Sequence, residues 1–166
     1  MAGFHVSLSW TDLANCQIAV RPYDPEFDNM CSILMDVTRA VEGKVMFHVS
    51  GFGQQRWLVD TGTDLPVFLE QLTDALRAIA LGLPANIDFY EQGLERHLTL
   101  TPLGDDCLVK CMSLTDWQPD PEDERIGTAE LLQMLIVFRD QFIDLLRHVA
   151  PGLLTHPWVR AWCEPR

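Results

Sequence analysis

The spacing of apolar residues changes three times along this chain, and this constrains the fold more than any other feature of the sequence. Phe4, Val6 and Leu8 alternate with polar or small residues, a spacing of two that is typical of a half-buried strand. From residue 65 the spacing becomes three and four, as in an amphipathic helix. Alternation returns at residue 86, and helical spacing returns at residue 128. Both periods in one chain predict an α+β fold.

Two long helices are predicted, over residues 65–83 and 128–149. Thr63 or Asp64 can cap the first helix, and Gly82 followed by Pro84 is a stop signal. Pro151-Gly152 ends the second helix. The predicted buried stripes are Leu65, Phe68, Leu72, Leu76, Ile79 and Leu83 on the first helix, and Leu131, Leu135, Phe138, Phe142, Leu145 and Val149 on the second.

Strands are predicted at residues 4–10, 16–20, 30–39, 44–50, 56–60, 86–90, 95–101 and 106–112. Gly104-Asp105 suits a two-residue hairpin turn, which pairs Leu98 with Cys111 and Leu100 with Val109. Consecutive strands with one helix between them and one after imply a mostly antiparallel sheet with the two long helices packed on one face. No repeat or linker divides the sequence, so residues 1–166 are predicted to form a single domain.

Charge narrows the classes of partner. The chain has 24 Asp and Glu residues against 12 Lys and Arg residues, a net charge of −12. This disfavours nucleic acid and anionic membranes, both of which need basic side chains, and it favours a basic protein partner. No export signal or membrane span is recognisable, and an odd number of widely spaced cysteines argues for free thiols. We therefore expect a soluble, cytoplasmic protein.

No pattern in the sequence indicates catalysis, a cofactor or a metal. Cys107 and Cys111 are the nearest approach to a metal motif, but their spacing is wrong for a zinc knuckle. The hairpin register also puts His97 on the opposite face from both cysteines. The glycines of the run 51–53 resemble part of a phosphate-binding loop, but no helix follows directly. The expectation is a protein that is not an enzyme and that has no metal or cofactor.

An acidic stretch near residue 120 is the best candidate for a binding surface. Residues 118–124 read Gln-Pro-Asp-Pro-Glu-Asp-Glu, which predicts an exposed loop. Tryptophan is enriched at binding hot spots, and one lies beside these acids. The predicted partner-binding residues are Asp116, Trp117, Asp120, Glu122, Asp123 and Glu124. A loop of similar character at residues 24–28 is the second choice.

The order of parts from residue 44 to 117 resembles the WapI-type immunity proteins of bacterial polymorphic toxin systems. The likeness comprises a strand ending at Trp57-Leu58-Val59-Asp60, the helix from Asp64, the Leu81-Gly82 stop, and the hairpin of residues 97–112. That family has no catalytic motif. The resemblance implies a cognate toxin, often a basic nuclease domain, that is neutralised by stoichiometric binding.

Three classes of function remain open from the sequence. The leading hypothesis is a protein-binding protein, specifically an immunity protein that occludes a basic toxin domain. The second is a small adaptor or chaperone-like protein of a secretion system. The third is an enzyme or a small-ligand-binding domain with a pocket between sheet and helices. A bare acidic groove would favour the first class, and a convergent polar pocket would favour the third.

Overall fold

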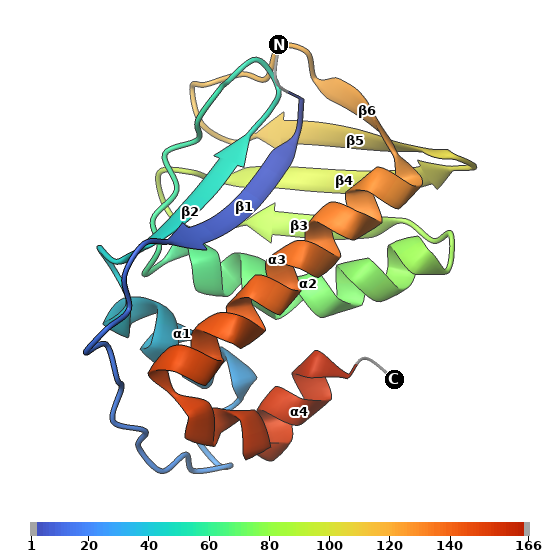
Figure 1. The fold of residues 1–166 in the computed structure, drawn as a ribbon. Coiled ribbons are helices and arrows are strands. Elements are labelled where there is room, and N and C mark those ends of the chain that lie inside the picture. Colours follow the sequence, from blue (N-terminus) through green and yellow to red (C-terminus); the bar gives the residue numbers. More distant parts are fainter. Residues whose placement is uncertain (1–2, 165–166) are drawn as a thin grey trace.

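The computed structural model describes residues 3–164 and has an α+β fold, as predicted (Figure 1). Residues 1–2 and 165–166 of the predicted domain lie outside the described part. In chain order the elements are β1 (His5–Trp10), α1 (Met30–Ala40), β2 (Val45–Ser50), α2 (Asp64–Ala80), β3 (Ala85–Phe89), β4 (Arg96–Leu103), β5 (Asp106–Ser113), β6 (Asp123–Gly127), α3 (Thr128–Val149), a 3-10 helix (Pro151–Thr155) and α4 (Pro157–Cys163).

The strands form two antiparallel sheets, whereas the sequence predicted one. β1 pairs with β2, and β3 to β6 form a four-stranded sheet in sequence order. The edge strands β1 and β6 approach each other near the N-terminus and then diverge (Figure 1). The predicted packing of both long helices on one face of one sheet is not confirmed: α2 packs mainly against β3, whereas α3 contacts β1 more than any other strand.

The β4–β5 hairpin has the predicted register. Leu98 lies opposite Cys111 and Leu100 lies opposite Val109. The turn requires glycine at position 104, where φ is +71°, a conformation that costs glycine little because it has no Cβ. The inward-facing side chains of this hairpin are fully buried, and its outer face is open to solvent.

Residues 30–39, predicted as a strand, belong to α1. The buried residues Ile33, Leu34 and Val37 fit helical spacing. Asn29 caps the helix: its side chain accepts the amide N–H of Cys31 at 2.8 Å, and its own amide donates to the Ser32 hydroxyl at 3.2 Å. This reciprocal capping box stabilises the first turn and fixes where the helix begins.

Two further predicted strands are absent from the described chain. Residues 16–20 have one backbone bond to the end of α3, from the Ile18 amide to the Val149 carbonyl at 2.7 Å, and no strand partner. Residues 56–60 run beside β2 but share a single backbone bond with it, from the Trp57 amide to the Val49 carbonyl at 2.8 Å. One bond is too few to form a ladder, so this segment stays irregular.

Aromatic side chains join the helices to both sheets. Phe68 of α2 lies 5.7 Å from Phe47 of β2, 6.0 Å from Phe89 of β3 and 4.8 Å from Phe138 of α3, measured between ring centres. Aromatic rings bury large areas each, so these contacts contribute strongly to the stability of the core. α3 has the predicted bounds, whereas α2 ends at Ala80, so Leu83 of the predicted stripe lies beyond the helix and is 53% exposed.

Candidate functional site

Four of the six residues predicted to contact a partner are exposed on the surface between β5 and β6. Asp116, Asp120 and Glu122 lie on the connecting loop, and Asp123 is the first residue of β6. The prediction of a loop over 118–124 is wrong at its end, because the last two residues pair with β5. We call residues 114–123 the acidic loop; its last residue, Asp123, is also the first residue of β6.

Glu124 is half-buried and is not the exposed contact that its acidic neighbours suggested. Its carboxylate accepts the amide N–H of Phe52 at 2.6 Å and also that of Phe4. A carboxylate can accept two such charge-assisted bonds at once. Glu124 therefore joins β6 to the start of β1 and to the end of β2, where the two sheets meet.

Trp117 is half-buried and stacks on a buried arginine. The guanidinium carbon of Arg96 lies 3.6 Å from the centre of the Trp117 ring and 4.3 Å from that of the Trp57 ring. Arg96 is only 5% exposed, because β4 places it on the same face as the core residues Leu98 and Leu100. The alternation of β4 could have identified it, since it lies two residues before Leu98 in a predicted strand.

Arg96 has no ion pair within residues 3–164. Its Nε and Nη1 atoms are buried and have no hydrogen-bond partner among these residues. Burial lowers its pKa to about 10, because desolvation disfavours the charged form. Burial also raises the pKa of the neighbouring Cys111 thiol to about 11. The two indole faces are the main attraction that holds this cation in place.

The acidic loop is locked against the turn that follows β2. The amide of Asp120 donates to the carbonyl of Phe52 at 3.1 Å. A Cβ atom at Gly53 would overlap the carbonyl of Asp120, and φ at Gly53 is +82°, so only glycine suits this position. The glycine run that resembled a phosphate loop thus packs against the acidic loop.

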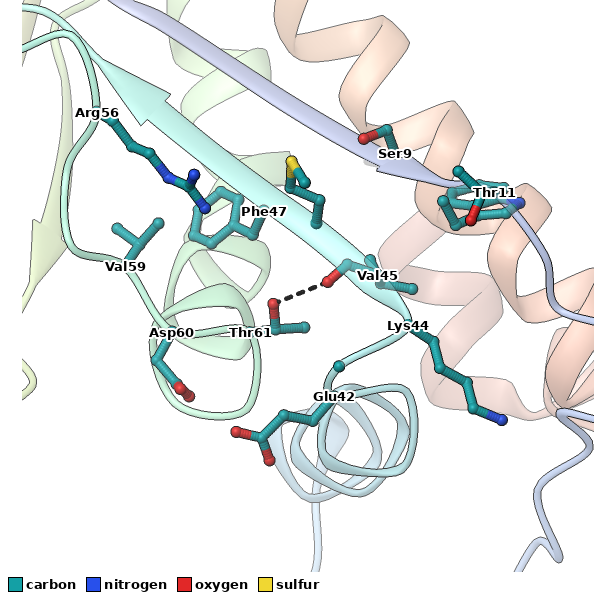
Figure 2. A pocket seen from close by; sticks show the side chains of 13 residues that line it. Ser9, Thr11, Glu42, Lys44, Val45, Phe47, Arg56, Val59, Asp60 and Thr61 are labelled. Atoms are coloured by element: carbon teal, nitrogen blue, oxygen red, sulfur yellow. Dashed lines mark hydrogen bonds between the residues drawn. The ribbon is translucent and has the colours of Figure 1, made fainter.

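A pocket of about 500 Å³ lies between β2 and the segment 56–61 that follows it (Figure 2). Arg56 reaches from this segment toward Phe47, whereas Lys44 points away (Figure 2). At the other end of the pocket the Thr61 hydroxyl donates to the carbonyl of Val45 at 3.2 Å. None of the residues that line this pocket was predicted as a site. The only signal was the predicted strand 56–60, whose failure to pair leaves the space open.

A thiol, a phenol and a carboxylate meet between α1, α2 and the end of β3. Glu70 accepts hydrogen bonds from the Cys31 thiol at 3.0 Å and from the Tyr90 hydroxyl at 2.6 Å. Burial, followed by the interaction with Glu70, raises the pKa of Cys31 to about 11. Because the thiolate is the reactive form, this arrangement makes Cys31 a poor nucleophile at neutral pH.

The other candidate ligand residues do not converge. All five cysteines are free, and Cys107 and Cys111 are buried on the face of β5 opposite to that of Met112, the β4–β5 partner of His97. Within residues 3–164, no three side chains of His, Cys, Asp or Glu lie close enough together to hold a metal ion.

Comparisons with protein-family models, with curated proteins and with solved structures find no match to this chain. The resemblance to WapI-type immunity proteins therefore stays a prediction. Among the described helices, none combines the length and the apolar character needed to span a bilayer.

Proposed function

We propose that this protein binds a basic protein partner through the acidic loop, and that the partner is a cognate bacterial toxin, which it neutralises by stoichiometric binding. Charge supports this proposal. A net charge of −12 attracts a basic domain at long range and raises its association rate. The side chains of Asp116, Asp120, Glu122 and Asp123 are exposed to such a partner.

The observation that carries the proposal is that the acidic loop is held in place before any partner binds. The amide of Asp120 is bonded to Phe52, and Trp117 is stacked on Arg96. A loop that is already ordered loses less conformational entropy on binding, so more of the contact energy contributes to affinity. Leu114 is 70% exposed on the same loop and offers the apolar contact that was predicted at Trp117.

Co-expression with the product of the neighbouring reading frame tests this function. We expect that product to contain a basic toxic domain, to stop bacterial growth when expressed alone, and to form an equimolar complex with this protein that restores growth. A non-toxic partner that needs this protein for export would instead fit an adaptor of a secretion system. Failure of the two products to form a complex would contradict the proposal.

A further inference from the structure

The edge of β2 that faces segment 56–61 has a gap in its hydrogen bonding. We call this gap the β2 slot and define it by Val45, Phe47, Arg56, Val59 and Thr61, which all line the pocket of Figure 2. At one end of the slot the Val49 carbonyl is bonded to the Trp57 amide. At the other end the Val45 carbonyl is bonded to the Thr61 hydroxyl.

The backbone groups of Phe47 lie between these two bonds and point the same way. Successive residues of a strand direct their N–H and C=O groups to opposite edges, so residues 45, 47 and 49 share one edge. That edge faces away from β1, because the amide of Val6, which lies opposite Val49, donates to the Met134 sulfur instead. No group among residues 3–164 bonds to the amide or the carbonyl of Phe47.

We propose that the β2 slot binds an extended segment of a protein partner, one residue of which pairs with Phe47 as an added antiparallel strand. A strand edge with an open donor and an open acceptor is the template that an extended main chain recognises. In an antiparallel pair a single residue exchanges both bonds with the residue opposite, which matches a gap of one residue. A volume of about 500 Å³ can also accept the flanking side chains.

Charges at the two ends of the slot give the segment a direction. Arg56 lies at the end near Val49. Asp60, Glu42 and Lys44 lie at the end near Val45, and because the Lys44 side chain points away from the slot, that end is acidic (Figure 2). An antiparallel segment begins beside Arg56 and ends beside the two acids. An acidic residue before the paired position and a basic residue after it would therefore complement the slot. This deepens the proposed function by naming the segment that the partner would supply.

Titration with a defined peptide tests the β2 slot without the partner. The probe is Ac-Glu-Thr-Val-Thr-Lys-NH2, and its matched control carries an N-methyl group on the valine, which removes the central donor. By amide NMR we expect the probe to shift the Phe47 resonance and to bind about fivefold more tightly than the control, which corresponds to the loss of one main-chain hydrogen bond. Equal binding of the two peptides would overturn the proposal, and so would absence of binding at millimolar peptide.

Two pairs of protein variants locate the site. Val59→Trp fills the slot and should abolish binding, whereas Leu58→Trp, at a neighbouring position that is 85% exposed, should not. Arg56→Glu should reverse the preference between the probe and the charge-swapped peptide Ac-Lys-Thr-Val-Thr-Glu-NH2, whereas Arg77→Glu on α2 should leave it unchanged. If neither Val59→Trp nor Arg56→Glu changes peptide binding, the assignment of the site to the slot is wrong. The toxin proposal is judged separately, by complex formation and growth.

Discussion

The Arg96 guanidinium carbon lies 3.6 Å from the ring centre of Trp117, so a residue of β4 and a residue of the acidic loop form one stack. The Trp57 ring centre lies 4.3 Å from the same carbon, and the two indole rings are tilted by 58° to each other, so they flank the guanidinium at an angle. A planar cation over the faces of two indole rings is attracted by both of them even where it is removed from water. The stack therefore ties the acidic loop to the four-stranded sheet.

Arg96→Lys should lower the free energy of unfolding by about 1–3 kcal/mol, because an ammonium group cannot stack as a plane and stays costly to bury. Arg96→Met should lower it by less, about 1 kcal/mol or below, because a flexible apolar side chain keeps the ring contacts and removes a buried charge. Urea denaturation of the two variants measures both values. Equal losses for lysine and methionine would show that the planar stack contributes little.

Glu124→Ala should lower the free energy of unfolding by about 2–4 kcal/mol, because it leaves the amides of Phe4 and Phe52 without their acceptor. Glu124→Gln keeps one acceptor oxygen and should cost less. Glu122→Ala is the control, since the side chain is exposed and its loss should change stability by less than about 0.5 kcal/mol. If the Glu124→Ala protein is as stable as the control, the hydrogen bonds of Glu124 do not stabilise the junction between the two sheets.

Leu72→Ala should lower the free energy of unfolding by about 2–5 kcal/mol, since the residue is fully buried on α2 and its removal leaves a cavity. Leu83→Ala is the matched control. Leu83 belongs to the same predicted stripe, but it follows the end of α2 and is 53% exposed, so its replacement should cost much less. Thermal melts showing similar losses for both would mean that the helix continues beyond Ala80.

The sequence correctly predicted those elements whose boundaries are marked by turn residues, prolines or a long periodic pattern. The β4–β5 register follows from Gly104 and from alternation on both strands, and α3 follows from a long stripe that ends at a proline. The prediction of a strand over residues 30–39 was wrong, because an apolar run suits either a strand or a helix. The capping residues Asn29 and Ser32 decide for the helix.

The parts that the sequence did not predict depend on contacts between distant residues. Segment 56–60 has the composition of a strand, but a strand exists only where a partner edge pairs with it. The candidate site shows the same limit. In the sequence Glu124 resembles its acidic neighbours, and only its hydrogen bond from the amide of Phe4, 120 positions earlier in the chain, distinguishes it. Arg96 was not predicted as a site residue, although it lies on the same face of β4 as Leu98 and Leu100 and is therefore directed into the core.

Lowering the pH should weaken the ion pair between Arg21 and Asp28, which holds together the segment that precedes α1. Hydrogen bonds from Arg21, and then from the Asp24 amide, lower the pKa of Asp28 from 3.8 to about 2. A carboxyl with a depressed pKa stabilises the folded state above its unfolded pKa. This stabilisation is complete above about pH 4 and is lost as the pH falls toward 2. In Arg21→Gln, a carboxyl NMR titration should show the pKa of Asp28 rising toward 3.8, whereas Arg39→Gln should leave it low.

Reversing the charge of Asp116, Glu122 and Asp123 to lysine should slow association with the basic partner by about tenfold or more at low salt, because steering depends on the local field. Folding should be retained, since all three side chains are exposed. The salt dependence of the association rate should also fall, because the interaction is screened over a Debye length of about 8 Å at physiological ionic strength. The control reverses Asp74, Asp105 and Asp140, which changes the net charge equally on other surfaces. If both triple variants slow association to the same extent, only the overall charge matters and the acidic loop is not the contact.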